Sequence, residues 1–541
     1  MSLLLKNITL KKTNSRELIH YRDDKGLYSN RSDDHLHHVN EESFDETVMC
    51  DLLQAAEKTD DRKVCRAIES ILEARNGNFS KSVPNFMAFC GMARAYLRHG
   101  LIDGWIYSQG SDGYLYPELV VGLRSTDPTR EDPCVSIHTE HYSPGGSGDR
   151  MGNNQTTYSF VPSSVTKKRL KDIFSEAGLS HETAKLKESY MRSMERYTEK
   201  ILPSFSRQFF FEGIPYLSGR SSRRSFRQKE YFLSRRKVIH NLDSGDYSLS
   251  VKETHSSIIG DPADNGTGVI PKKPLVEVFD LSSYTYFWSH SDSLSEYKYD
   301  LSLREKIILP ESHRDLLDIL TTNLDQFLND VIDGKSSGNV ILCKGIPGVG
   351  KTLTAEIYSE LMERPLYMIH SGKLGVTASS VSENLRRIFE ETKRWGCVLL
   401  LDEADVFVVK RGNSIEQNAI VAEFLKILEY FDGLLFMTTN RPNDIDDAIV
   451  SRCAAIIDYH PPGEDHCTRI WNIMSRQFGV PLDPVLVSDL VKLFPGIVPR
   501  DIKMLFRLAV KMSVGHKEPL TIDVFRRCAM FRAIEMKETI S

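Results

Sequence analysis

The sequence has few features of secreted or membrane-spanning proteins. Its nine cysteines among 541 residues are scattered and include no CxxC pair, which predicts reduced thiols and a cytoplasmic location rather than a disulfide framework. Apolar runs such as Val398–Leu401 and Leu434–Met437 fall far short of the ~20 residues that a membrane helix needs. The first six residues hold only three consecutive leucines before Lys6, so no secretory signal and no membrane partner are expected.

The chain also lacks a strong charge of either sign. Its net charge is −5 and its calculated pI is near 6.4, so no global basic excess marks it as a nucleic-acid binder. Hydrophobic residues make up 40% and charged residues 26%, a composition typical of globular proteins. At about 150 residues per domain, this length predicts three to four structural units.

The N-terminal half predicts an α+β region without a recognisable functional motif. Residues 1–44 are polar and show little apolar periodicity, so an irregular segment is expected there. Residues 45–250 combine helical spacing with short strand-like runs between Gly, Asp and Ser turns, which predicts an α+β domain for a substrate or partner.

The segment after this domain is rich in turn-forming residues. Residues 260–273 contain few apolar side chains, so we expect a linker over 251–275 and a connector over 276–304.

The C-terminal 240 residues have a different pattern. Strand-length apolar runs alternate with amphipathic helical segments, which favours a parallel sheet covered by helices on both faces, the α/β class. After Pro461 and Pro462 only helical patterns remain. We therefore expect an α/β subdomain over 305–460 and a helical lid over 461–541.

A glycine-rich loop lies between a predicted strand and a predicted helix of this α/β subdomain. The run Gly345–Thr352 reads GIPGVGKT and matches the pattern GxxxxGK[ST]. Glycines let successive backbone N–H groups converge on phosphate oxygens, and the following helix directs its positive end at the same anion. The alternative is a glycine-rich turn that precedes a lysine by chance. The predicted nucleotide-binding residues here are Gly345, Pro347, Gly348, Val349, Gly350, Lys351, Thr352 and Leu353.

Two carboxylates follow a buried strand about fifty residues later. The run Val398–Leu401 leads directly into Asp402 and Glu403, which places both at the carboxyl edge of the predicted sheet. Asp402 and the Thr352 hydroxyl are suited to hold Mg²⁺, and Glu403 is suited to polarise an attacking water. An acidic strand end exposed to solvent is the alternative. ATP and Mg²⁺ are thus the expected cofactors.

These motifs together resemble those of a known family. The Gly345–Thr352 loop, the run Asp402–Asp405, and Phe436–Pro442 followed by Asp446–Arg452 resemble the AAA+ ATPases, and more closely their AAA branch. The resemblance covers residues 305 to 535. Within the family, the chain looks similar to a subgroup of multidomain AAA ATPases. It implies an enzyme that hydrolyses ATP to ADP and phosphate.

The resemblance implies roles for three further residues. Asn440 matches the sensor that orients the lytic water, although it could be a turn asparagine. Arg452 matches an arginine finger that reaches the nucleotide of a neighbouring subunit, which implies a homo-oligomeric ring with a hexamer as the expected form. The family often has two arginines in this motif, and here only Arg452 fits. Arg500 matches a second sensor arginine of the lid that contacts nucleotide, although Asp501 could simply cap a helix there.

Two segments bear on the substrate. The run Ser371–Val376 has Lys373 and Leu374 where polypeptide-threading relatives carry an aromatic pore loop, which weakens a threading interpretation. Residues Arg220–Lys237 hold eight basic side chains and one acidic one, with aromatics between them. Such a stretch can bind nucleic acid, or it can be a solvated face or a contact to an acidic neighbour.

Three functions remain open at this point. The favoured one is a ring ATPase that remodels a complex of protein substrates. The second is a nucleic-acid-stimulated motor or loader that uses Arg220–Lys237. The third is an assembly platform in which ATP binding acts and hydrolysis only resets the state.

Overall fold

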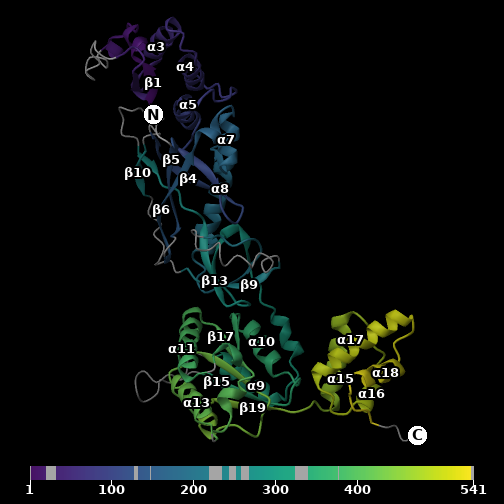
Figure 1. Ribbon diagram of the computed structural model, residues 1–541. Coiled ribbons are helices and arrows are strands. Elements are labelled where there is room, and N and C mark those ends of the chain that lie inside the picture. Colours follow the sequence, from purple (N-terminus) through teal and green to yellow (C-terminus); the bar gives the residue numbers. More distant parts are fainter. Residues whose placement is uncertain are drawn as a thin grey trace.

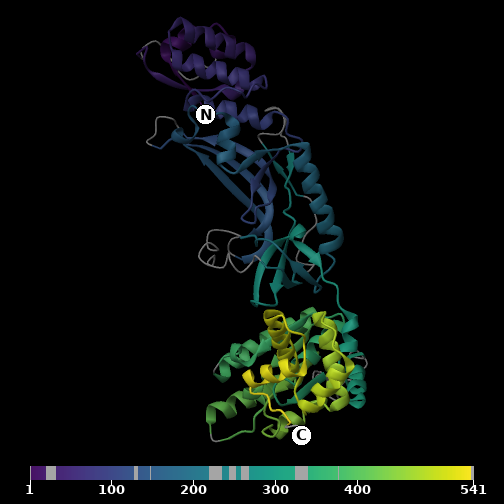
Figure 2. The same cartoon turned by 90° about the vertical axis from the view of Figure 1, so that its right-hand side faces the viewer.

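Figure 1 shows the computed structural model of the chain. The structure describes residues 2–19, 32–126, 132–145, 148–217, 234–242, 252–256, 267–322, 339–375, 377–412 and 414–537. The described residues up to 300, here called the arm, form an elongated body above the parallel-sheet domain of residues 301–460 (Figures 1 and 2). The helices of residues 461–537, the lid, lie beside that domain. Within these described ranges, no helix combines the length and the apolar character needed to cross a bilayer.

The far end of the arm is a layer of helices with a small two-stranded antiparallel sheet. Its elements are β1 Ser2–Lys6, α1 Asn7–Lys11, β2 Leu36–Asn40, α3 Glu46–Lys58, α4 Arg62–Arg75 and α5 Phe86–Arg98. β1 pairs antiparallel with β2, and Leu3, Leu5 and Val39 are buried in the same core as the three longer helices. The prediction of an irregular segment over 1–44 is therefore wrong for its described residues. A strand whose partner lies thirty residues away leaves no local signal of pairing.

The shaft of the arm is a five-stranded antiparallel sheet of order β6-β5-β4-β3-β7. Its strands are β3 Trp105–Gln109, β4 Leu115–Ser125, β5 Val135–Gly145, β6 Gly148–Phe160 and β7 Leu179–His181, accompanied by helices α6 Pro162–Val165, α7 Leu170–Glu176 and α8 Ala184–Arg196. Apolar residues of β3 to β6 pack into the same core as α4 and α5, so the shaft and the helical layer share one hydrophobic cluster.

A second antiparallel sheet, here called the middle sheet, lies where the arm meets the parallel-sheet domain (Figure 2). Its strands are β8 Gln208–Phe211, β9 Arg236–His240, β12 Leu275–Asp280, β13 Thr285–His290 and β14 Leu294–Glu296, in the order β13-β12-β9-β8-β14. Three of these five strands come from residues predicted as a connector, so the connector over 276–304 is wrong.

The linker predicted over 251–275 is also wrong in its described part. Strands β10 Glu253–His255 and β11 Thr267–Val269 pair with each other, and Trp105 Nε1 donates to the Val269 carbonyl at 2.9 Å. Ile270 packs with Trp105 in a small core of the shaft. Turn-forming composition reports local backbone preference, and it carries no information about pairing with distant strands.

The parallel-sheet domain has the predicted α/β architecture. Its strands are β15 Asn339–Gly345, β16 Leu366–His370, β17 Val398–Asp402, β18 Leu434–Thr439 and β19 Ala455–Tyr459. All four pairings in the order β16-β17-β18-β15-β19 are parallel. The helices are α9 Glu311–Thr322, α10 Lys351–Leu361, α11 Ala378–Trp395, α12 Asp405–Val408, α13 Ile415–Leu428 and α14 Asp447–Val450.

Both faces of this sheet are buried. Alternate side chains of the strands belong to two separate cores, one shared with α11 and α13 and one shared with α9 and α10. A parallel sheet covered on two faces requires apolar residues at successive strand positions, which explains the continuous apolar runs in the sequence.

The predicted helical lid is also confirmed. It consists of α15 Glu464–Phe478, α16 Pro484–Leu493, α17 Pro499–His516 and α18 Ile522–Phe531, which pack around Trp471, Phe506 and Phe525.

Candidate functional site

The glycine-rich loop connects β15 to α10 in a conformation that needs glycine. Gly345, Gly348 and Gly350 have φ angles of 148°, 88° and 108°, which side chains rarely permit. A Cβ at Gly345 would lie 2.4 Å from the Tyr459 carbonyl oxygen, so a side chain has no room there. The loop thus brings the unpaired N–H groups at the start of α10 to the sheet edge, where they can bind an anion.

Lys351 joins this loop to the end of β18. Its side chain is buried, and its Nζ donates to the carbonyls of Gly345 and Ile346, both at 2.8 Å. The same Nζ donates to Asn440 Oδ1 at 2.9 Å. Burial lowers the pKa of Lys351, while the nearby carboxylates of Asp402 and Asp405 oppose that shift. The lysine is therefore held beside the loop within reach of a bound phosphate.

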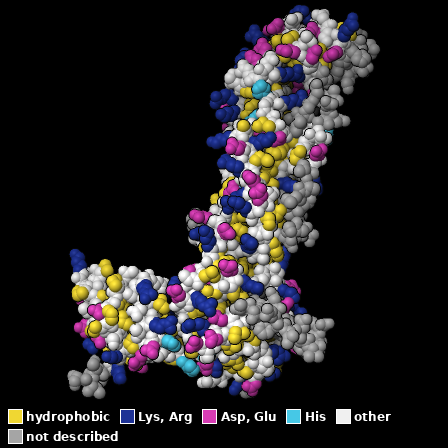
Figure 3. Space-filling model, turned by 180° about the vertical axis from the view of Figure 1, so that it is seen from behind, with side chains coloured by type: hydrophobic (Ala, Val, Ile, Leu, Met, Phe, Trp, Pro, Cys, Tyr) yellow, Lys and Arg dark blue, Asp and Glu magenta, His cyan; other side chains and the backbone are white. Residues whose placement is uncertain are grey.

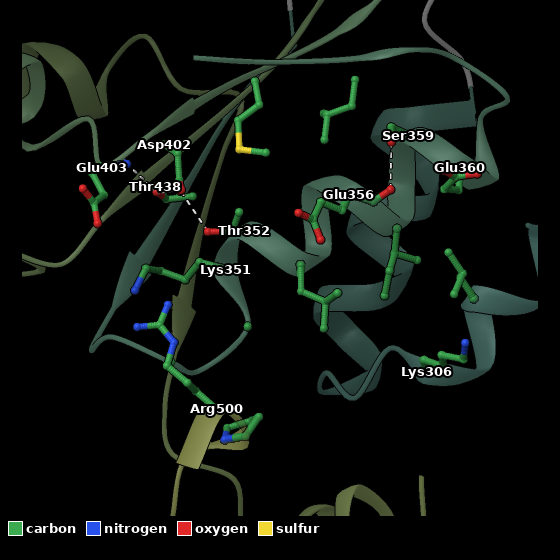
Figure 4. Close-up of a pocket in the computed structure, with 18 of the residues that line it drawn as sticks. Lys306, Lys351, Thr352, Glu356, Ser359, Glu360, Asp402, Glu403, Thr438 and Arg500 are labelled. Carbon is green, nitrogen blue, oxygen red and sulfur yellow. Dashed lines mark hydrogen bonds between the residues drawn. The ribbon is translucent and has the colours of Figure 1, made fainter. Parts of the chain in front are cut away.

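Asp402 lies at the end of β17 and faces the start of α10 (Figure 4). Its Oδ1 accepts a hydrogen bond from the Thr352 hydroxyl at 2.8 Å and another from the Thr438 hydroxyl at 2.7 Å. A carboxylate and a hydroxyl this close offer hard oxygen ligands of the kind that Mg²⁺ prefers. The chemistry of Thr352 and Asp402 therefore fits the magnesium ligands expected from the sequence.

Glu403 and Asn440 complete this edge of the sheet. Glu403 has a φ of 55°, and its backbone N donates to the Thr438 hydroxyl at 2.9 Å. Asp405 accepts hydrogen bonds from the Asn440 backbone N at 3.1 Å and from the Thr439 hydroxyl. Sequence reasoning assigned no role to Thr438 or Asp405. Both lie within the motifs Asp402–Asp405 and Phe436–Pro442, but Thr438 reads there simply as part of a buried strand.

These groups line a cavity of about 1100 Å³ at the junction of loop, lid and arm. Of the predicted site residues, the lining contains Pro347, Gly348, Gly350, Lys351, Thr352, Leu353, Asp402, Glu403, Asn440 and Arg500. Val349 does not line it and instead packs into the core beside α10. Gly345 contributes through its carbonyl contact with Lys351.

The two predicted arginines take different positions. Arg500 lies at the start of α17, its backbone N donates to the Gly348 carbonyl at 3.2 Å, and its side chain lies near Lys351 (Figure 4). Arg452 is not among the described residues that line the cavity, and its guanidinium lies 3.7 Å from the Glu429 carboxylate. The structure brings Arg500 into the site and leaves Arg452 outside its own subunit's cavity.

Most of the predicted basic stretch Arg220–Lys237, namely residues 220–233, lies outside the described residues. The three basic residues that are described all contact the chain itself. Arg235 lies 3.7 Å above the Phe210 ring, Arg236 pairs with Asp280, and Lys237 donates to the Tyr297 hydroxyl at 2.8 Å. On the face shown in Figure 3, basic and acidic side chains are interspersed over the arm and the lid.

Three features together define a P-loop nucleoside triphosphatase site. They are a glycine-rich loop after the first strand of a parallel sheet, a Thr–Asp pair beside that loop, and a polar residue after the intervening strand β18. Comparison with known proteins gives the family. Residues 341–460 match the family model "ATPase family associated with various cellular activities (AAA)". The chain therefore carries an AAA+ ATPase domain, which implies that it binds ATP.

Curated relatives match about a third of the chain. An uncharacterised AAA family ATPase of Sinorhizobium fredii is 30% identical over 160 residues, which are 28% of this chain and 47% of that protein. A 26S proteasome regulatory subunit homolog of Methanothermobacter marburgensis is 30% identical over 192 residues, 33% of this chain and 50% of that protein. The ATP-dependent zinc metalloprotease FtsH of Thermobaculum terrenum is 27% identical over 192 residues, 32% of this chain and 29% of that protein. The chain thus spans about half or less of the length of these relatives.

Proposed function

We propose that this protein hydrolyses Mg-ATP to ADP and phosphate in a homo-oligomeric ring, with a hexamer as the expected form, and uses the cycle to remodel a protein complex. The observation that carries the proposal is the meeting of Lys351, Asp402, Glu403 and Asn440 at one edge of the parallel sheet. No observation among the described residues favours the nucleic-acid alternative.

The geometry supports a division of roles for hydrolysis. Lys351 and the N–H groups of the loop would hold the β- and γ-phosphates. Thr352 and Asp402 would hold Mg²⁺, which neutralises charge on the phosphates. Glu403 would accept a proton from the water that attacks the γ-phosphorus, and Asn440 would orient that water. The bond between the γ-phosphorus and the β–γ bridging oxygen would then break, and ADP and phosphate would leave.

The position of Arg452 supports an oligomer. Arg452 is away from its own cavity, and its side chain is 34% exposed beside Glu429, so it is available to a neighbouring subunit. A cation placed against the γ-phosphate stabilises charge in the transition state of phosphoryl transfer. We therefore propose that Arg452 completes the site of the next subunit.

Contacts between the arm and the ATPase domain support remodelling through the arm. The Tyr284 hydroxyl donates to the Met368 carbonyl of β16 at 2.6 Å, and the Asp300 backbone N donates to Glu360 of α10 at 3.1 Å. Lys373 lies 3.7 Å above the Tyr284 ring, and Leu374 beside it is fully buried. The segment that corresponds to a pore loop therefore contacts the arm. We propose that residues 45–250 recognise a protein substrate and move with the nucleotide cycle.

The names of two relatives, a proteasome regulatory subunit homolog and a metalloprotease, agree with a protein substrate. The cytoplasmic location stays a prediction.

Glu403→Gln tests the hydrolytic role. This variant should retain ATP binding and hydrolyse ATP about 10²–10⁴-fold more slowly, the range of a lost general base. Release of phosphate and binding of labelled ATP are the measurements, and Glu188→Gln on the exposed face of α8 is the control. Wild-type turnover in Glu403→Gln would contradict the proposal. Proteins that co-purify with the ATP-loaded variant identify the substrate, whereas full biological activity without hydrolysis would favour the assembly platform.

The ring is tested with mixed subunits. Arg452→Ala and Glu403→Gln subunits should each be inactive alone and should recover some turnover when mixed, because a mixed ring contains complete sites. Absence of recovery at every mixing ratio would contradict the role of Arg452 across an interface.

A further inference from the structure

Thr438 contacts both of the acidic residues that end β17, the Asp402 carboxylate and the Glu403 backbone. It is the penultimate residue of β18, and its side chain is 2% exposed. The adjacent strand pairs Leu401 with Met437, so the next residue of each strand, Asp402 and Thr438, lie side by side. The position of Thr438 beside Asp402 follows from the register of β17 and β18, so it does not depend on the rotamer of either side chain.

The hydroxyl of Thr438 has two partners in this site. It donates to Asp402 Oδ1 at 2.7 Å and accepts from the Glu403 backbone N at 2.9 Å. The carbonyl of the same residue accepts from the Ala404 backbone N at 2.8 Å. Thr438 thus contacts three successive residues of the turn that follows β17.

The second of these bonds stabilises an unusual backbone conformation. Glu403 has a φ of 55°, the left-handed region, which costs a non-glycine residue of order 1–3 kcal/mol. The direction of the Glu403 side chain follows from this conformation. A hydroxyl that accepts from the Glu403 N–H therefore also orients the carboxylate that would act as general base.

The first bond holds the carboxylate that would face the metal. Asp402 Oδ1 accepts from Thr352 as well as from Thr438, and Figure 4 shows Thr438 and Thr352 on either side of it. If the Thr352 oxygen becomes a metal ligand, Thr438 still keeps Asp402 in place. As a β-branched residue, threonine has few χ1 rotamers, which makes it a rigid support.

We infer that Thr438 is a positioning residue for this site, whose single hydroxyl sets both the Asp402 carboxylate for Mg²⁺ and the Glu403 backbone for water activation. The inference rests on the proposed function. The neighbouring Thr439 differs, because its hydroxyl bonds Asp405 on the Asn440 side of the site.

The test compares Thr438→Val, which removes the hydroxyl and keeps the shape, with Thr438→Ser, which keeps the hydroxyl. Thr392→Val is the matched control, because Thr392 is a buried threonine whose hydroxyl donates to the Ile388 carbonyl within α11 at 2.7 Å, away from the site. Equilibrium binding of fluorescent ADP is measured with and without Mg²⁺, and steady-state hydrolysis gives kcat and KM.

Thr438→Val should weaken the Mg²⁺ dependence of ADP binding and lower kcat by about 10–100-fold, the range typical of residues that orient metal ligands. Binding of ADP without Mg²⁺ should be unchanged, since Lys351 and the loop keep their contacts. Thr438→Ser should restore both properties, and Thr392→Val should leave both at wild-type values.

Two outcomes would overturn the inference. One is a wild-type Mg²⁺ dependence and kcat in Thr438→Val. The other is an equal loss of ADP binding with and without Mg²⁺, which would indicate a purely structural role. The Mg²⁺ dependence of ADP binding does not require hydrolysis. If the wild-type protein binds Mg-ADP but never releases phosphate from ATP, the proposed hydrolytic function is contradicted. The role of Thr438 is still tested in that case, because ADP binding with and without Mg²⁺ can be compared between the variants.

Discussion

The parallel sheet of the ATPase domain and the middle sheet of the arm both have five strands, but they serve different purposes. In the parallel sheet all strands run the same way, so their carboxyl ends share one edge where polar loops meet a ligand. In the antiparallel middle sheet strand ends alternate, so no such edge exists. The direction of its strands therefore explains why the polar site residues gather at one edge of the parallel sheet.

The contacts of the two regions differ accordingly. The carboxyl edge of the parallel sheet, here called the nucleotide edge, is a network of polar groups joined by hydrogen bonds around Lys351 and Asp402. The joint between the middle sheet and the ATPase domain is aromatic. The Phe279 ring lies 4.8 Å from the Trp395 ring and 5.3 Å from the Tyr367 ring, centroid to centroid. Substitutions at the joint should therefore mainly lower stability, and substitutions at the nucleotide edge should mainly weaken ligand binding.

The largest effect on stability is expected at the joint. Phe279 is completely buried against Trp395, so Phe279→Ala should lower the free energy of unfolding by about 3–5 kcal/mol through lost burial and a cavity. Urea unfolding followed by circular dichroism measures it, and Phe279→Leu is the milder control. A loss below about 1 kcal/mol would indicate that the arm is not docked on the ATPase domain in solution.

A substitution at the nucleotide edge should weaken ADP binding without an equal loss of stability. Lys351→Met removes a charged donor to phosphate and should weaken ADP binding by about 1.5–3 kcal/mol, or roughly 10–150-fold. Stability should change much less than ADP binding, because relief of the buried ammonium opposes the loss of its hydrogen bonds to Gly345, Ile346 and Asn440. Equilibrium ADP binding and urea unfolding are the two measurements. The exposed Lys393→Met on α11 is the control, and equal ADP affinity in both variants would refute a phosphate role for Lys351.

The smallest effect is expected for a single hydrogen bond of the same joint. Tyr284→Phe removes the 2.6 Å hydrogen bond to Met368 but keeps the ring under Lys373, so the free energy of unfolding should fall by about 0.5–1.5 kcal/mol. Melting temperature and ATP hydrolysis are measured on the same samples. A change in hydrolysis larger than the change in stability would show that the joint communicates with the nucleotide edge, and unchanged values of both would show that this contact is not formed.

The predicted parts of the fold are those with local signals. Strands β15 to β18 contain continuous apolar runs with helical segments between them, so these four strands could be read in order from the sequence. β19 was not predicted, because Asp458 interrupts its short apolar run. The middle sheet could not, because β8, β9 and β12 come from separated segments and none of them is longer than six residues. Likewise β1 pairs with a strand thirty residues away, and the turn-rich run around Ile270 packs into the shaft.

The amino-acid sequence by itself determined the chemistry of the nucleotide edge, because GIPGVGKT and the Asp402–Glu403 pair specify backbone shape and ligand type within a few consecutive residues. Only the tertiary structure decided that Thr438 contacts the Asp402 carboxylate and the Glu403 backbone, that Arg452 lies outside the cavity, and that Lys373 lies over the Tyr284 ring of the arm. These relations depend on strand register and on packing between residues that are far apart in the chain, and no local pattern records them.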